Sequence, residues 1–359
     1  MYYRRWSILA AVLAGLLAGL LAAGAADLHA EAPPKGPVQV FILAGQSNME
    51  GHGSVEMGRD PADAANPDAK SKPVEGGLGS LRRLVTQQPD RYGPAGKTPL
   101  VGKDGQWLVR DDVWIWATTD KGERGRLAVG FGARDTIGPE FGFGHVVGNH
   151  ADGPVLIIKT SWGGKDLAVD FRTPSAGPAP EYVKGKRREA IDADGALVGH
   201  FYRLMLEHVK DVRTNLATYF PELAGRETRL AGFGWHQGWN DGCSADMTAE
   251  YESNLVHFIR DLRKDLGAES LPVVIATSGF GGREQAQDRR LGIINAQLAV
   301  ADAAKHPEFK GTVAAVETRD FWRPVEQSPS RQGYHWNGNG ETHYLIGEAM
   351  GRAMIDLMK

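Results

Sequence analysis

The sequence predicts a three-layer α/β/α fold, built on a flavodoxin-like, doubly wound parallel sheet of about five strands. Short apolar runs bounded by turn residues alternate along the chain with longer segments of helical periodicity. That alternation is typical of parallel strands joined by helices that cover both faces of a sheet. The chain has 359 residues, 42% hydrophobic and 24% charged, which is enough to bury a sizeable core. No internal repeat is evident, so we expect one domain over residues 38–359.

The first 26 residues predict a secretory signal peptide. Two arginines precede an apolar run over residues 8–26, and that run ends in Gly-Ala-Ala. A basic start, an apolar middle and small residues at the cleavage region are the features of such a peptide. A Pro-rich linker over residues 27–37 follows. We therefore expect a secreted or periplasmic protein with no stable membrane insertion after cleavage. The alternative is an N-terminal membrane anchor, because the run is nearly long enough to span a bilayer.

Five apolar runs are the expected strands, at residues 38–44, 155–159, 230–235, 273–277 and 312–317. Between and after them lie four segments with apolar residues close to the 3.6-residue repeat of a helix, at residues 195–220, 247–266, 283–304 and 341–358. In a doubly wound sheet, ligands bind beyond the carboxyl ends of the strands. Chemistry is therefore expected in the segments that follow the strands.

Two long polar segments, residues 52–131 and 166–194, interrupt the alternation. Long loops without secondary structure in a compact domain are usually functional or disordered. Trp107, Trp114 and Trp116 lie near the end of the first segment. These tryptophans either pack the loop onto the body of the protein or stack on sugar rings.

Charge and cysteine content narrow the class of protein. The net charge is −3, and no basic block is present, so we expect no nucleic-acid partner. Cys243 is the single cysteine, which rules out an internal disulfide bond. We expect a structural role for Cys243, although a catalytic thiol is the alternative.

Ser47 stands directly after the first strand, in the segment "GQSNMEG", and a polar loop is expected after it. A serine at such a strand end can present its hydroxyl group together with neighbouring backbone amides, which is the pairing that acyl transfer requires. Gly163, in "SWGG" after the second strand, could supply another amide, although an ordinary turn explains the glycines equally well. Taken alone, each segment is weak evidence.

The segment "WHQGWND" after the third strand clusters Gln237, Asn240 and Asp241. Neutral amides suit an oxyanion because they donate hydrogen bonds without releasing a proton. His236 beside them is expected to be a packed, hydrogen-bonded residue. In "GYHWNGNG" before the last helix, His335 can reach back over the sheet as a base, whereas His343 is expected to be structural. No third ligand follows at a metal-site spacing, so we expect no metal and no other cofactor.

Together these segments resemble the conserved blocks of SGNH hydrolases, in the branch that contains sialate O-acetylesterase-like proteins and acetylxylan esterases. The segment "IGPEFGFG", residues 137–144, also resembles a stretch of that branch. The resemblance implies removal of acetyl groups from carbohydrates through an acetyl-serine intermediate. It makes Ser47 the nucleophile and His335 the general base. It also places the oxyanion at the amides of Ser47 and Gly163 and at the side chain of either Gln237 or Asn240.

Two positions depart from that family. Trp239 follows "QG" where the branch usually has glutamate, and Gln332 stands where an aspartate normally precedes the histidine by three residues. A glutamine cannot stabilise an imidazolium by charge, and an acid-to-amide change of this kind costs about 10⁴ in rate in serine proteases. Other possible acid partners of His335 are Asp320, Glu326 and Glu341. A Ser-His dyad and an inactive carbohydrate-binding relative are the further alternatives, as is an SGNH lipase acting on other esters.

Overall fold

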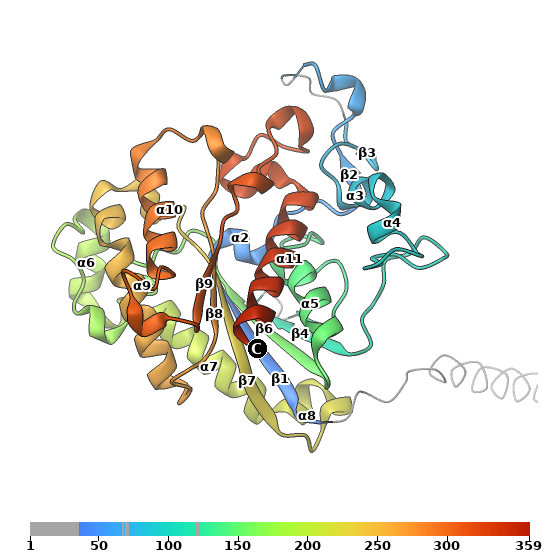
Figure 1. The fold of residues 1–359 in the computed structure, drawn as a ribbon. Coiled ribbons are helices and arrows are strands. Elements are labelled where there is room, and N and C mark those ends of the chain that lie inside the picture. The colour runs from blue at the N-terminus through green and yellow to red at the C-terminus, as the bar shows by residue number, and fades with distance from the viewer. Residues whose placement is uncertain (1–35, 67, 69–71, 119–122) are drawn as a thin grey trace, which may run out of the picture. The chain divides into compact units, whose positions relative to one another are not determined.

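The computed structural model describes residues 36–66, 68, 72–118 and 123–359. The signal peptide and nearly all of the linker predicted for the amino terminus lie outside these residues. The five predicted strands are all present and lie side by side in the order β6-β1-β7-β8-β9 (Figure 1). Their bounds are Val38–Gly45 for β1, Val155–Ser161 for β6, Thr228–His236 for β7, Val273–Ala276 for β8 and Val313–Val316 for β9. All four neighbouring pairs are parallel, and this is the flavodoxin strand order, so the predicted fold class is confirmed.

The predicted number of strands is wrong, because the sheet has seven strands among the described residues. Strand β4 (Val113–Ala117) pairs in parallel with β6, and β5 (Glu123–Arg126) lies antiparallel to β4 at the edge. Both belong to the segment that the sequence suggested was a loop. Trp114 and Trp116 are therefore core residues of a strand buried on both faces. Glycines and charged residues around the short run "VWIWA" concealed it.

The two long segments also contain secondary structure of their own. The first holds a small hairpin of β2 (Met57–Gly58) and β3 (Val74–Glu75), followed by helices α3 (Leu81–Gln87) and α4 (Pro89–Tyr92). The second holds helix α6 (Gly185–Ala193). Neither segment is the long structureless loop that its composition suggested.

Side chains of β1 alternate between two cores, one on each face of the sheet. Val40 and Ile42 face a core that includes residues of α7, α9 and α10. Phe41 and Leu43 face the other core, which α5 and α11 complete (Figure 1). This alternation follows from the two-residue period of a strand. The layers are therefore helices, sheet and helices, as predicted.

The four predicted helical segments form; two of them are shorter than predicted, and the other two are shifted by one or two residues. They are α7 (His200–Thr214), α9 (Ala245–Asp265), α10 (Asp288–Val300) and α11 (Gly340–Leu357). The segment at 195–220 is divided, because a short helix α8 (Leu216–Tyr219) follows α7 after a break. Helix α5 (Pro139–His150) was not predicted, since its glycine-rich first turns are buried on nearly all sides and show no polar face. None of the helices in the described ranges has the length and apolar character needed to cross a membrane.

Candidate active site

Ser47 begins a single helical turn, α2 (Ser47–Glu50), directly beyond the carboxyl end of β1 (Figure 1). The polar loop expected there is therefore a helical turn. Strand β1 lies between β6 and β7, where the strand order reverses, which is the usual ligand position in doubly wound sheets. Gly45 is required because a Cβ atom there would lie 2.1 Å from the His236 carbonyl oxygen. This close approach joins the end of β1 to the end of β7.

Gln46 ties the Ser47 turn to the segment that follows β7. Its Oε1 accepts hydrogen bonds from the backbone amides of Gly238 at 3.2 Å and Asn240 at 3.3 Å, and from the Gln237 side chain at 3.3 Å. Gln46 was not singled out from the sequence, although its place inside the "GQSNM" motif is a signal that could have identified it. It acts as a buried crosslink between two of the four motif segments.

Gly163 lies beside Ser47, as the motif reading expected. A Cβ atom built on Gly163 would lie 3.9 Å from the Cβ of Ser47 and 3.6 Å from Oε2 of Glu50. The preceding residue, Trp162, donates its backbone N–H to the Gly45 carbonyl at 3.3 Å. The turn after β6 is thereby fixed against the end of β1.

The two oxyanion candidates after β7 differ in their surroundings. Gln237 is 2% exposed, and its amide nitrogen donates to the Lys165 carbonyl at 3.0 Å and to Asp241 Oδ2 at 2.6 Å. Its oxygen accepts from the Tyr251 hydroxyl at 2.9 Å. Asn240 is partly exposed and donates one hydrogen bond, to the Gly164 carbonyl. Gln237 is thus committed to a buried network, whereas Asn240 lies at the surface beside the "SWGG" turn.

Asp241 connects this network to the second long segment. Its carboxylate accepts from the backbone amides of Leu167 and Ala168, at 3.0 to 3.1 Å, and from Gln237. Burial, reinforced by the nearby carboxylate of Asp166, raises the pKa of Asp241 to about 7. Asp241 therefore holds the start of the second long segment, at Leu167 and Ala168, against the segment that follows β7.

His335 lies in a tight turn, η10 (Gly333–Gly338), which packs on α2. Asn48, the neighbour of Ser47, donates its side-chain amide to the Tyr334 carbonyl at 2.9 Å. Trp336, fully buried with a φ of 54°, anchors the turn from below. Ser47 and His335 are thereby brought to the same place, but their side chains are not hydrogen-bonded to each other in this structure.

None of the three possible acid partners of His335 is hydrogen-bonded to it among the described residues. Asp320 pairs with Arg283 at 2.8 Å, and Glu341 pairs with Arg323 at 2.8 Å. Glu326 makes no hydrogen bond to His335 either. Gln332 is exposed, and its backbone carbonyl, not its side chain, accepts from the His335 amide at 2.7 Å. The Nδ1 atom of His335 is buried and has no hydrogen-bond partner in the described part of the chain.

His52, which the sequence reading passed over, lies against His335. The two imidazole rings stack with centroids 3.7 Å apart and planes 8° from parallel. Burial lowers the pKa of His335 below its usual value. Burial, together with positive charge on His335, Arg134 and Lys159, lowers the pKa of His52 to about 4. His52 directly follows the "GQSNMEG" segment, but nothing in the spacing pairs it with residue 335.

His343 and His236 are buried in the positions expected of structural histidines. The Nε2 of His343 accepts from the His52 amide at 3.3 Å, and its Nδ1 lies 2.9 Å from the Asn339 carbonyl. Burial lowers the pKa of His343 to about 3. His236 lies at the end of β7 with Nδ1 3.4 Å from the Ala276 carbonyl, and burial lowers its pKa to about 4.

A buried ion pair supports the Ser47 turn from below. Lys159 and Glu140, both at most 1% exposed at the side chain, lie 3.1 Å apart. The Lys159 ammonium also donates to the carbonyl of Glu50, at 2.8 Å, and to that of Phe131. Glu140 belongs to the "IGPEFGFG" segment, so this motif contributes a residue beneath the site. The sequence reading did not single out either charge.

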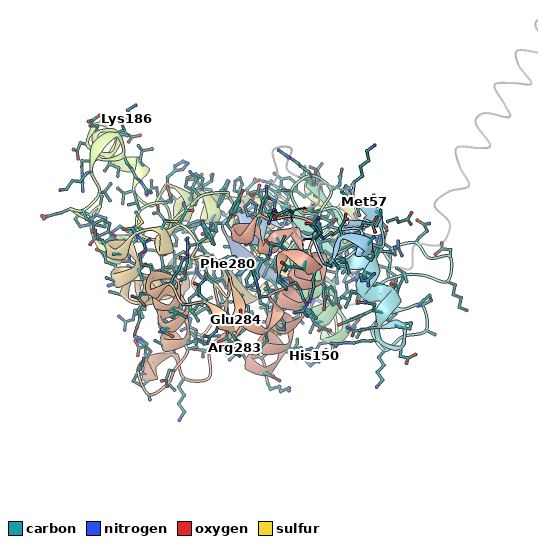
Figure 2. All side chains as sticks on the ribbon, turned by 90° about the horizontal axis from the view of Figure 1, so that it is seen from above. Met57, His150, Lys186, Phe280, Arg283 and Glu284 are labelled. Carbon is teal, nitrogen blue, oxygen red and sulfur yellow. The ribbon has the colours of Figure 1, made fainter. Side chains whose placement is uncertain are left out.

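An aromatic surface adjoins His335. Tyr334 is 42% exposed, and its ring centroid lies 4.5 Å from that of His335 and 5.8 Å from that of Trp239. Trp239 is held by the guanidinium of Arg290, 3.7 Å from its ring centroid, and by the edge of Phe280 (labelled in Figure 2). The departure from the family at Trp239 therefore places an aromatic ring where glutamate is usual.

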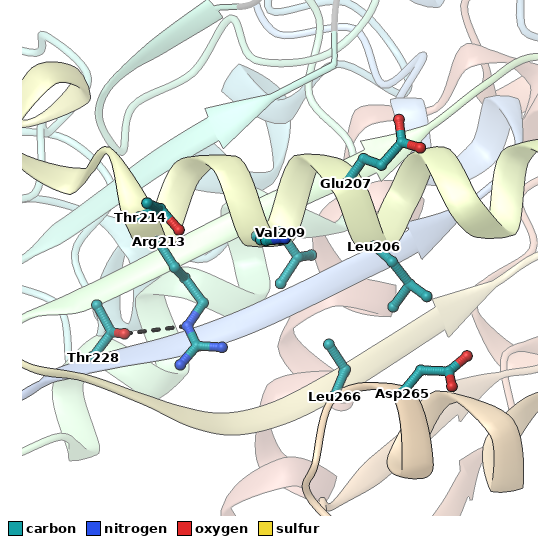
Figure 3. Close-up of a pocket in the computed structure, with 9 residues that line it drawn as sticks. Leu206, Glu207, Val209, Arg213, Thr214, Thr228, Asp265 and Leu266 are labelled. Atoms are coloured by element: carbon teal, nitrogen blue, oxygen red, sulfur yellow. Dashed lines mark hydrogen bonds between the residues drawn. The ribbon is translucent and has the colours of Figure 1, made fainter.

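Two other features lie apart from this site. Figure 3 shows a pocket between α7, the end of α9 and the start of β7, where Arg213 donates to the Thr228 hydroxyl at 3.1 Å. Since β7 runs from Thr228 to His236, that pocket lies at the opposite end of the strand. Cys243 is exposed, with Sγ 3.4 Å from the Trp239 carbonyl. Across residues 36–66, 68, 72–118 and 123–359, no three histidine, cysteine or acidic side chains converge as a metal-binding group.

The doubly wound sheet, with four motif segments gathered around the end of its first strand, defines the class as an SGNH-type hydrolase. The chain belongs to the family described as "Carbohydrate esterase, sialic acid-specific acetylesterase", whose model matches residues 37–320. It is accordingly a carbohydrate esterase by family.

Solved structures are similar to the chain in fold. A protein from Arabidopsis thaliana superposes with a TM-score of 0.51 at 16% identity, over 89% of this chain and 98% of that one. A carbohydrate acetylesterase from Xanthomonas citri gives a TM-score of 0.45 at 13% identity, over 86% of this chain and 55% of that one. NanS gives 0.40 at 13% identity, over 79% of each chain. No curated protein matches the sequence.

Proposed function

We propose that the protein is an exported serine esterase that removes O-acetyl groups from carbohydrates through an acetyl-serine intermediate. The observation that carries this proposal is the convergence of Ser47, Gly163, Asn240 and His335 at the carboxyl end of β1 in a chain of the carbohydrate esterase family. These segments are far apart in sequence, and each contributes one group that acyl transfer needs.

In this mechanism Ser47 attacks the acetyl carbonyl carbon while His335 accepts the hydroxyl proton. The backbone amides of Ser47 and Gly163 and the side chain of Asn240 donate hydrogen bonds to the oxyanion. As the bond between the acetyl carbon and the sugar oxygen breaks, His335 donates its proton to that oxygen, and the sugar leaves with a free hydroxyl group. Water, activated by His335, then hydrolyses the acetyl-enzyme to acetate and restores Ser47. Asn240 is favoured over Gln237 because Gln237 already uses its donors in a buried network. Asn240 has to release only the Gly164 carbonyl.

The first test is turnover of p-nitrophenyl acetate by the wild type and by Ser47→Ala. Turnover should disappear in the variant, because no other group on the site supplies the nucleophile. Undiminished turnover would remove Ser47 from the mechanism. Acetate release from a panel of acetylated glycans then identifies the sugar.

Two rival functions are separated by similar measurements. A carbohydrate-binding protein without catalysis is favoured by the absence of a carboxylate on His335 in the described residues, and stoichiometric labelling of Ser47 by a fluorophosphonate would argue against it. An esterase or lipase for other substrates would prefer long-chain esters over acetyl esters. A preference for acetyl esters supports the carbohydrate assignment.

A further inference from the structure

The position of the His335 ring is defined by contact with another ring. His52 and His335 stack with centroids 3.7 Å apart and planes 8° from parallel. Nε2 of His52 and Nδ1 of His335 are both buried without hydrogen-bond partners among the described residues. A catalytic histidine is normally oriented by a hydrogen bond from Nδ1–H to a carboxylate. Here the face of the His52 ring, and not a carboxylate, contacts the His335 ring.

The backbone around His52 is rigidly held. The His52 amide donates to Nε2 of His343 at 3.3 Å, and the next residue, Gly53, forms a two-bond bridge with Ile137 at 2.9 and 3.0 Å. The Ser54 amide donates to the Gly338 carbonyl at 3.0 Å, which belongs to the same turn as His335. Both rings are therefore mounted on one connected frame. None of these bonds uses the His52 side chain, so that side chain can be replaced without breaking them.

We propose that His52 is the positioning residue for His335, holding the plane of its ring by stacking where related enzymes use a carboxylate. The inference rests on the proposed function, in which His335 is the general base. Stacking fixes the tilt of the ring, but it does not select which nitrogen carries the proton. It therefore replaces only the orienting part of the carboxylate's role, not its charge.

Stacking can support a base only if His52 stays uncharged when His335 takes the proton, because two positive rings in contact repel each other. The charged and titratable groups around His52 favour its neutral form. Burial and the positive groups His335, Arg134 and Lys159 lower the pKa of His52 to about 4. His343, which faces its backbone, is also held neutral by burial. Above about pH 4 His52 is therefore uncharged, and the protonated His335 of the proposed mechanism meets no positive ring in the stack.

The test compares His52→Ala with His52→Phe, using p-nitrophenyl acetate and the pH profile of kcat/KM. Alanine frees the His335 ring, and we expect kcat to fall about 10- to 100-fold with little change in KM. Phenylalanine keeps a flat ring in the stack and should retain activity to within a few-fold of the wild type. Alanine also admits water to the His335 ring, so the acid limb of the profile should move to higher pH, whereas phenylalanine should leave it low. His150→Ala, at an exposed helix end, is the matched control.

Two outcomes overturn the inference. One is a His52→Ala variant with wild-type melting temperature, kcat and acid limb. The other is a folded His52→Phe variant that is as impaired as His52→Ala, which would show that stacking is not the property that matters. If His52→Ala does not fold, the phenylalanine variant and its pH profile still decide. If Ser47→Ala turns over p-nitrophenyl acetate as fast as the wild type, the proposed function fails instead. That result is obtained independently of the His52 variants.

Discussion

Asn240 and Gln237 carry the same functional group in different surroundings, and these surroundings predict different effects of substitution. Asn240→Ala should lower kcat by roughly 10²–10³, the usual loss for one side-chain oxyanion donor, and leave the melting temperature nearly unchanged. Gln237→Ala should instead lower stability, because it removes one buried hydrogen-bond partner from each of Tyr251 and Asp241. Steady-state kinetics and thermal melts on the two variants check this. The reverse pattern would make Gln237 the donor.

The environment of His335 predicts where the enzyme loses activity in acid. Burial lowers the pKa of His335 from its usual value of 6.5. A base must be neutral to accept a proton, so the acid limb of the kcat/KM profile should lie below pH 6.5. A pH series with p-nitrophenyl acetate measures this limb directly. A limb above pH 6.5 would contradict the role assigned to His335 or its burial.

At the scale of elements, the Lys159–Glu140 pair joins β6 and α5 to the turn that carries Ser47. Glu140→Gln leaves a buried ammonium without its counter-ion, and removal of one partner of a buried pair costs about 3–5 kcal/mol. The free energy of unfolding from urea titrations should fall by that amount. The double replacement Lys159→Met with Glu140→Leu should recover much of the loss, because neither charge then remains buried. A single variant as stable as the wild type would contradict this account.

The aromatic surface formed by Tyr334 and Trp239 predicts a selective effect on carbohydrate substrates. Tyr334 is exposed and Trp239 is partly buried beside the proposed base; flat apolar ring faces there can contact a sugar ring, and small esters do not need them. Tyr334→Ala and Trp239→Ala should therefore raise KM for an acetylated glycan and leave p-nitrophenyl acetate turnover near the wild-type value. Tyr334→Phe, which keeps the ring, is the control. Equal losses on both substrates would indicate a disturbed His335 instead of a lost sugar contact.

At the scale of the whole molecule, buried histidines predict a pH-dependent stability. Burial lowers the pKa values of His145, His236 and His343 to between about 3 and 4. The unfolded chain, with the usual pKa of 6.5, binds protons that the folded protein cannot bind. Stability should therefore be full above pH 6.5 and fall as the pH drops toward 4.

Thermal melts between pH 4 and pH 8 measure this dependence. His145→Phe should make the acid side of the curve less steep, since one of the three buried rings no longer titrates. His150→Phe, at an exposed position, should leave the curve unchanged. A stability that does not change below pH 6.5 would show that the three rings are not buried in solution.

The strands β6, β1, β7, β8 and β9 could be predicted from sequence because each is a continuous apolar run, and their order follows from the doubly wound pattern. The two strands that extend the sheet beyond β6 could not, since β4 lies among charged residues and β5 consists of three charged residues and a glycine. Helix α5 was missed for a similar reason, because a helix buried on nearly all sides has no polar face to mark it.

The fold class, the family and the four segments that carry the proposed site residues Ser47, Gly163, Gln237 or Asn240, and His335 could all be predicted from the sequence. The strands, the helices and the motif segments are each a run of neighbouring residues, so their pattern is visible in the sequence. The surroundings of His335, in contrast, are set by long-range packing and could not be predicted. Gln332 marked a missing acid but could not indicate a substitute, because His52 lies 283 positions before His335 in the sequence and meets it through a stacked ring contact. Such a contact depends on how the turn after β1 packs against the turn before the last helix, and this long-range packing cannot be inferred from short sequence motifs.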